Sequence, residues 1–115
     1  MDQRLASPLR IQVTAVRREV DRRHVALAEA SNVMEALASE PWDRLTPDQA
    51  GMRELSPHAR AMLPAGTLRV DIIGDLDGLP SKRLDVEVRW LAQPGRPVAK
   101  VRFSSWVYQN GEEKK

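Results

Sequence analysis

The sequence contains no cysteine. This absence excludes a disulfide framework, a thiolate metal site, a cysteine nucleophile and a redox motif. The sequence also has no run approaching the roughly 20 apolar residues that span a bilayer, and the segment Met1 to Arg4 lacks the apolar region of a signal peptide. We therefore expect the chain as given to be soluble.

Charge of one sign is not in large excess either. The 18 basic and 16 acidic residues leave a net charge of +2, so the composition does not indicate a polyanion-binding surface. With 42% hydrophobic and 30% charged residues, the chain is globular, and its 115 residues fit a single domain.

The patterns that carry catalysis or hold cofactors are missing. The six glycines are isolated, and none forms a phosphate-binding loop or a Gly-x-Ser-x-Gly elbow. His24 and His58 fall on separate predicted helices, with no spacing that would present two nitrogens to one metal. We expect no catalytic, metal-binding or cofactor-binding residue, no cofactor and no enzymatic activity.

One short acidic motif resembles the start of a calcium loop. Asp75 and Asp77 alternate before Gly78, as carboxylates do where they wrap a hard cation. Pro80, Ser81 and Lys82 follow, however, where such a loop needs further oxygen ligands. The motif is therefore interpreted as a plain hairpin turn.

A long amphipathic helix is predicted over about residues 8–40. Ser7 and Pro8 supply an N-cap and a proline at the first helical position, and Pro41 marks the end. At 1.5 Å per residue such a helix exceeds the diameter of a compact domain of this size, so part of it should project or find a partner. Its apolar residues alternate at spacings of three and four, with one gap near Arg23: Leu9, Val13, Val16, Val20, Leu27, Ala30, Met34 and Leu37.

The two halves of this helix differ in composition. The half before Val25 carries a run of arginines with Glu19 and Asp21 between them, and ion pairs such as Glu19 with Arg23 predict an exposed, salt-bridged face. The half after Val25 is Ala-rich with a broader apolar face, which indicates packing against another layer. The arginines that form a candidate electrostatic contact are Arg17, Arg18, Arg22 and Arg23.

Residues 42–66 are predicted to be irregular, with short helices. Thr46 and Gln49 form a capping-box pattern around Pro47. Ser56 and Pro57 begin a second short helix that continues to Leu63, where a Pro-Ala-Gly turn ends it.

Residues 67–108 change to an alternation of period two, which predicts three amphipathic strands followed by a frayed tail, 109–115. The connections are too short for crossover helices, so the strands should form an antiparallel meander with one apolar face. Trp106 and Tyr108 have the opposite parity to Phe103, and they either form an exposed contact patch or lie over the sheet edge.

The fold class that follows is α+β, with the long helix packed across a three- to four-stranded antiparallel sheet. Only the second half of the helix is apolar enough to cover the apolar face of the sheet. The predicted helix-to-sheet core consists of Leu27, Ala30, Met34, Leu37, Val70, Val86, Val88, Trp90, Val101 and Phe103.

This order of elements resembles that of type IV pilin-like proteins, in particular minor pilins and the minor pseudopilins of type II secretion. The resemblance covers about residues 10–108. It is carried by the Ala-rich helix end from Ala26 to Leu37, by Pro41 to Leu45, by Leu63 to Val70, and by the strand Lys82 to Trp90 that ends in tryptophan.

The resemblance implies a non-enzymatic structural subunit, the periplasmic head of a filament protein in the cell envelope. The first half of the helix, through Leu9, Val13, Val16 and Val20, would face the helices of other pilin or pseudopilin subunits. The family's leader and N-terminal apolar segment are absent from this sequence, so we expect a soluble head, with inner-membrane contact only if such a segment precedes it.

A second hypothesis is a soluble binding module that uses the basic helix Arg17 to Arg23 on nucleic acid or another protein. Nucleic acid is the disfavoured partner, because Glu19 and Asp21 interrupt the basic run and no aromatic residue lies within it to stack on bases.

Overall fold

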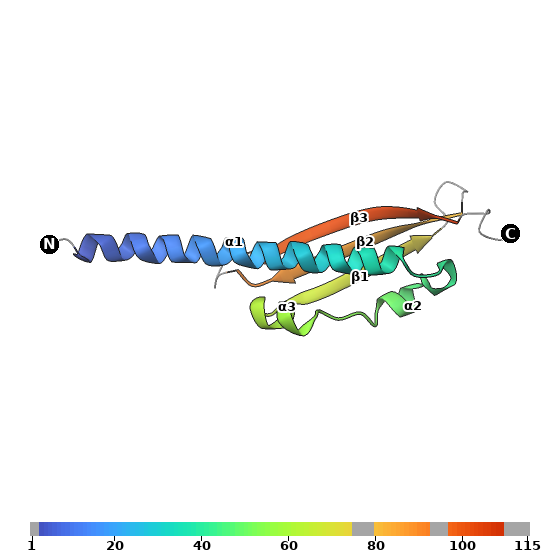
Figure 1. The fold of residues 1–115 in the computed structure, drawn as a ribbon, viewed down its shortest axis with the longest axis horizontal. Helices are drawn as coiled ribbons and strands as arrows, with labels where there is room; N and C mark the ends of the chain where they lie inside the picture. Colours follow the sequence, from blue (N-terminus) through green and yellow to red (C-terminus); the bar gives the residue numbers. More distant parts are fainter. Residues whose placement is uncertain (1–2, 75–79, 93–96, 110–115) are drawn as a thin grey trace.

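The computed structural model describes residues 3–74, 80–92 and 97–109, with side chains described from Val16 onwards. It contains one long helix, three short helices and three strands (Figure 1). The elements in chain order are α1 (Gln3–Ala38), η1 (Trp42–Arg44), α2 (Pro47–Ala50), α3 (Pro57–Met62), β1 (Thr67–Gly74), β2 (Ser81–Trp90) and β3 (Ala99–Tyr108).

The strands form one antiparallel sheet in the order β1-β2-β3. In its register Val86 of β2 lies between Val70 of β1 and Phe103 of β3. Residues of one parity therefore share the inner face of the sheet, which packs on α1, and residues of the other parity share the outer face. The predictions of an α+β fold and of an antiparallel meander are confirmed, with three strands in the described residues.

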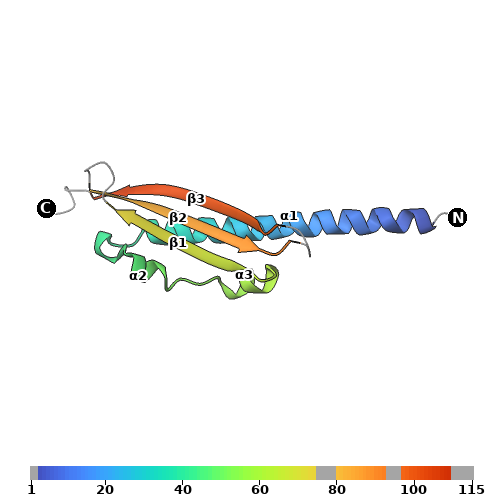
Figure 2. The same cartoon turned by 180° about the vertical axis from the view of Figure 1, so that it is seen from behind.

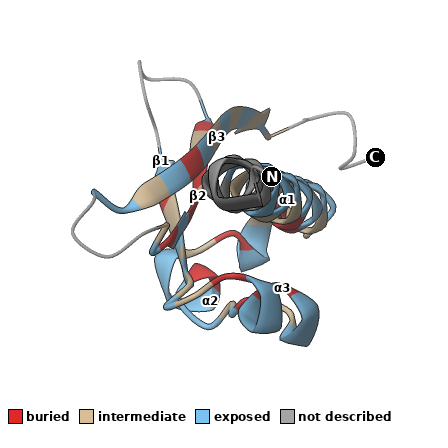
Figure 3. Cartoon of the chain, turned by 90° about the vertical axis from the view of Figure 1, so that its left-hand side faces the viewer, coloured by how far each residue is buried: buried red, intermediate tan, exposed pale blue. Residues whose placement is uncertain are grey.

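The core lies between the second half of α1 and the inner face of the sheet, and it extends under α2 and α3 (Figures 1 and 3). Buried aliphatic side chains and one tryptophan fill this layer, because packing the apolar face of the helix on the apolar face of the sheet removes both from water. Its members are Ala26, Ala30, Val33, Leu37, Leu45, Ala50, Leu55, Ala59, Leu63, Ile72, Leu84, Val86, Val88, Trp90 and Val101.

One predicted core residue is wrong. Leu27 is 36% exposed, whereas its neighbour Ala26 is fully buried. A helix that lies close against a sheet needs small residues at the contact, and Ala26 and Ala30 provide them. The remaining predicted core residues are buried or partly buried: Ala30, Leu37, Val86, Val88, Trp90 and Val101 are buried, and Met34, Val70 and Phe103 are partly buried against them.

The predicted start of the long helix is also wrong. α1 begins at Gln3 rather than at about Pro8, and it continues through Pro8 to Ala38. Pro8 lies in the second turn of α1, so it removes the bond that its N–H would donate to the Arg4 carbonyl, and its ring crowds that carbonyl; this cost is confined to the N-terminal end of the helix. The end before Pro41 is as predicted, since the residue preceding a proline is disfavoured in helical conformation.

Both short helices begin where the sequence predicts. The side chain of Thr46 accepts a hydrogen bond from the Gln49 N–H at 3.2 Å, and the side chain of Ser56 accepts one from the Ala59 N–H at 3.2 Å. Only half of the predicted capping box forms, because the backbone N–H of Thr46 donates to the Arg44 carbonyl instead of to Gln49.

Two side chains tie the irregular segment 39–66 to the layers beside it. Lys82 Nζ donates to the carbonyls of Trp42 and Leu45, each at 2.8 Å, and lies 4.3 Å from the centroid of the Trp42 ring. Glu29, on α1, is 9% exposed and accepts from both the N–H (2.7 Å) and the hydroxyl (2.9 Å) of Ser56. Because Ser56 caps α3, the carboxylate of Glu29 fixes the start of that helix against α1.

Replacing Glu29 by alanine should therefore lower the free energy of unfolding by about 2–3 kcal/mol, because two hydrogen bonds to a charged, nearly buried acceptor are lost. Hydrogen exchange of the α3 amides should accelerate as well. Glu35→Ala is the matched control, since Glu35 lies on the same helix and is exposed. Unfolding in urea, together with exchange measured by mass spectrometry, tests this; unchanged protection of residues 57–62 in Glu29→Ala would contradict it.

Candidate functional site

The first part of α1 projects from the sheet. The molecule measures 76 × 25 × 24 Å, and Figures 1 and 2 show the N-terminal part of α1 extending past the end of the strands. Of the four predicted interface residues, Val16 is 64% exposed and Val20 is 46% exposed. The side chains of Leu9 and Val13 lie outside the described residues.

We call the place where α1 leaves the sheet the neck. It is formed by Glu19, Arg22 and Arg23 of α1 with Trp90, the last residue of β2, and Ala92 just beyond it. The Trp90 Nε1–H donates to Glu19 Oε2 at 3.2 Å. An Arg22 N–H donates to the Ala92 carbonyl at 3.2 Å. The Arg23 guanidinium lies 5.5 Å from the centroid of the Trp90 ring. These contacts couple the direction of the projecting helix to the end of β2.

The neck divides the predicted arginine run into two pairs. Arg22 and Arg23 are engaged within the molecule, whereas Arg17 and Arg18 are exposed on the projecting part of α1. The predicted ion pair of Glu19 with Arg23 is wrong: Glu19 lies 3.8 Å from Arg22, one turn away at i,i+3, and Arg23 turns to the tryptophan ring.

The outer face of the sheet holds a buried carboxylate that the sequence analysis missed. Asp85 is 5% exposed although it points away from α1. It accepts hydrogen bonds from the Ser104 hydroxyl at 2.7 Å and from Arg102 at 3.1 Å, and Arg83 lies 3.2 Å away. Burial raises the pKa of Asp85, but the bonds from Ser104 and Arg102 and the two guanidinium charges outweigh it and hold the pKa below its ordinary value.

The predicted aromatic contact patch is exposed. Trp106 is 52% and Tyr108 61% exposed, and both lie on the outer face of β3. Arg83 of β2 lies opposite Trp106 of β3 on one side and opposite Ile73 of β1 on the other. Ile73 is 37% exposed. Buried polar atoms normally have a partner, and the Nε of Arg83 is buried without one in the described part of the chain.

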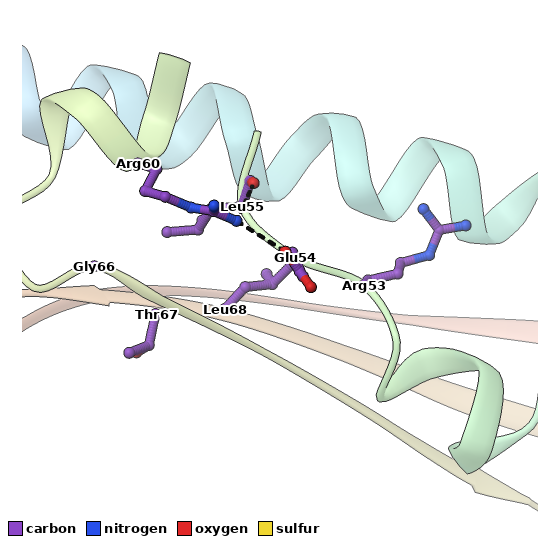
Figure 4. A pocket seen from close by; sticks show the side chains of 7 residues that line it. All are labelled: Arg53, Glu54, Leu55, Arg60, Gly66, Thr67 and Leu68. Atoms are coloured by element: carbon purple, nitrogen blue, oxygen red, sulfur yellow. Dashed lines mark hydrogen bonds and ion pairs between the residues drawn. The ribbon is translucent and has the colours of Figure 1, made fainter. Parts of the chain in front are cut away.

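A shallow pocket of about 280 Å³ lies beside the start of β1 (Figure 4). Two arginines line it, but acidic partners hold both of them: Arg60 pairs with Glu54 at 2.9 Å, and Arg53 pairs with Glu40 at 3.4 Å. The pocket therefore offers no uncompensated charge to a ligand.

The remaining sequence candidates for a metal or cofactor site do not come together. His24 and His58 are both exposed. Within residues 3–74, 80–92 and 97–109, no group of three or more histidine, aspartate or glutamate side chains could hold a metal ion. Asp75, Asp77 and Gly78, the residues interpreted as a hairpin turn, lie outside the described residues.

No helix in the described part of the chain combines the length and the apolar character needed to cross a bilayer. Comparison with protein-family models, with curated proteins and with solved structures finds no match for the chain.

Proposed function

We propose that the protein is a non-enzymatic structural subunit, the head of a minor pilin or pseudopilin that acts in assembly of an envelope filament. The observation that carries this proposal is the division of α1 into two parts. From Ala26 to Leu37 a buried stripe holds the sheet, whereas before Glu19 the helix projects with Val16 exposed. A helix that projects apolar side chains is suited to packing on other helices.

The charges of the projecting part complement this role. Arg17 and Arg18 are exposed beside Val16 and Val20, where they would meet acidic side chains of neighbouring subunits or anionic lipid head groups. Arg22 and Arg23 instead hold the neck. Because Arg22 and Arg23 of the run are engaged at the neck, a nucleic-acid-binding surface on this run is weaker than the sequence alone suggests.

The first test is the N-terminus of the endogenous protein, determined by mass spectrometry of membrane and filament fractions from its source cells. We expect a form that carries about 20 additional apolar residues before the helix. A soluble form that begins at Met1 and is absent from both fractions would overturn the proposal.

The second test targets the projecting helix. Val16→Asp and Val20→Asp should each reduce incorporation into filaments at least about tenfold, because a charge buried between packed helices is strongly destabilising. The thermal midpoint of the purified chain at low micromolar concentration should change little, since both side chains are exposed in the single chain. Asn32→Asp, also exposed on α1 but over the sheet, is the matched control. Normal incorporation of both valine variants would contradict the proposed interface.

A further inference from the structure

β3 is an edge strand in the described part of the chain, since the sheet order gives it a partner on one side only. It is ten residues long, and Figures 1 and 2 show no other element of the described chain along its outer edge. The opposite edge differs, because α2 and the segment before α3 lie along β1. A long, regular and uncovered edge strand is a template for pairing with another strand.

The hydrogen-bond pattern shows which groups of β3 are available. The Gln109 N–H donates to the Pro80 carbonyl at 2.9 Å, which continues the ladder between β2 and β3. In an antiparallel ladder such bonds occur at every second residue. The intervening residues, whose side chains lie on the outer face, therefore point their backbone N–H and C=O groups to the free edge: Lys100, Arg102, Ser104, Trp106 and Tyr108.

We propose that this edge binds the β3 edge of a second copy of the chain, antiparallel, about a two-fold axis at Ser104. Two-fold symmetry makes a strand pair with itself in antiparallel direction. In this register Arg102 lies opposite the partner's Trp106, and Lys100 lies opposite the partner's Tyr108. Each cation then faces an aromatic ring, a favourable pairing, and no like charges meet.

Registers with the axis at the next outward-facing residue on either side of Ser104 are less favourable. An axis at Arg102 places this arginine opposite its own copy, and like charges directly opposite each other are destabilising. An axis at Trp106 leaves Lys100 beyond the end of the paired region. Ser104 lies near the middle of β3, so an axis there pairs almost the whole strand.

A second exposed feature lies on the same side of the molecule. Glu29 faces α3, because it accepts both hydrogen bonds from Ser56. Leu27 precedes Glu29 by two residues, so it lies about 160° around the helix from it, on the side away from α3. In Figures 1 and 2, α3 lies on the β1 side of the sheet, which places the side of Leu27 toward β3.

The two-fold axis joins these two features into one interface. It places both copies of α1 on the same face of a continuous sheet, each with its β3 side toward the other. Val20 and Leu27, 46% and 36% exposed in the single chain, would then face the partner's helix. The proposal explains both the open edge and the exposed Leu27, and it does not depend on the proposed function.

Because the chain has no cysteine, single substitutions test the register directly. Lys100→Cys and Tyr108→Cys are made in separate chains, which are mixed and oxidised. Opposed residues of a hydrogen-bonded pair have Cα atoms about 5.5 Å apart, within disulfide range. In either variant alone the two cysteines would lie roughly 26 Å apart. We expect a disulfide dimer that forms at least about ten times faster in the mixture than in either variant alone.

Sedimentation velocity gives the second readout. The unmodified chain should sediment as a dimer at about 100 μM. Trp106→Pro should shift it to monomer with its circular dichroism retained, because proline removes an N–H that points to the free edge. Trp106→Thr retains that N–H and should weaken the dimer less. A monomeric unmodified chain, or equal cross-linking in the mixture and in the single variants, would overturn the proposal.

Discussion

Replacing Asp85 by asparagine is expected to lower the free energy of unfolding at pH 7 by about 1–3 kcal/mol. The amide oxygen of asparagine still accepts a bond from Ser104, but its amide hydrogens face the guanidinium groups of Arg83 and Arg102 instead of neutralising them. The effect stays below that of breaking a fully buried ion pair, because the side chain of Arg102 is 56% exposed and is hydrated readily.

The contribution of Asp85 depends on pH. Its pKa is lower in the folded chain than the ordinary value of 3.8, so the folded state binds the proton less tightly than the unfolded state does. The stabilisation is therefore fully present above about pH 5, and it is lost as the pH falls through 3.8 and then through the lower folded-state pKa. Urea unfolding at pH 7 and pH 3 should show that the difference between the native chain and Asp85→Asn is smaller at pH 3 than at pH 7, because the unfolded state is already protonated there.

Asp71→Asn is the matched control for this experiment. Asp71 lies directly opposite Asp85 in the register, but its side chain is 45% exposed and pairs with Arg69 at 3.0 Å. Loss of an exposed ion pair costs little, and removal of the like charge opposite Asp85 offsets part of it. We expect a change within about 0.5 kcal/mol. Equal destabilisation by the two substitutions, or a difference for Asp85→Asn that does not shrink between pH 7 and pH 3, would contradict the role of the Asp85 carboxylate.

The sheet was predictable because period-two alternation decides which face of a strand is buried. From Leu84 to Trp90 every second residue of β2 is apolar, and all four of these residues are buried. The short connections then allowed only an antiparallel meander. The caps at Thr46 and Ser56 were equally readable, since a capping side chain acts on an N–H three residues away.

The face of α1 that packs on the sheet was only partly predictable. Hydrophobic periodicity favours Leu27 over Ala26 because leucine is larger and more apolar. Close approach of the α1 backbone to the sheet requires a small residue at the contact, and Ala26 is the residue buried there. The leucine is then left on a second stripe, with Val16 and Val20, that the described part of the molecule does not cover.

The neck and the Asp85 cluster depend on contacts between residues that are distant in the sequence. Glu19 and Trp90 are separated by 71 positions. The spacing rules for side chains on one helix predict only ion pairs of Glu19 with arginines three or four residues away. In the sequence, Asp85 is indistinguishable from the other polar residues of an alternating strand, which are expected to be exposed to solvent. Its burial comes from its central position in the sheet and from Arg102 and Ser104 on β3, and only a correct register would have placed these partners beside it.

Replacing Trp90 by alanine is expected to have the largest effect of any single substitution considered for this chain, a loss of about 3–5 kcal/mol in the free energy of unfolding. Trp90 is fully buried at the end of β2 and belongs to the core that joins α1 to the sheet. The substitution leaves a cavity at the neck and removes the donor for Glu19 and the ring beneath Arg23. Domains of this size are stabilised by roughly 5–15 kcal/mol in total, so the variant should have a much lower thermal midpoint and be almost fully unfolded at the thermal midpoint of the native chain.

Trp90→Phe separates packing from hydrogen bonding at the neck. Phenylalanine keeps most of the buried area but lacks the indole N–H, so the loss should fall to about 1–2 kcal/mol. The side chain of Glu19 is 31% exposed and still has Arg22 nearby, which limits the cost of an unmet acceptor. Trp106→Ala, the same change at a 52% exposed position, should cost less than about 1 kcal/mol at low micromolar concentration. Urea unfolding followed by far-ultraviolet circular dichroism measures all three variants; equal losses in Trp90→Ala and Trp106→Ala would show that Trp90 does not anchor the helix to the sheet.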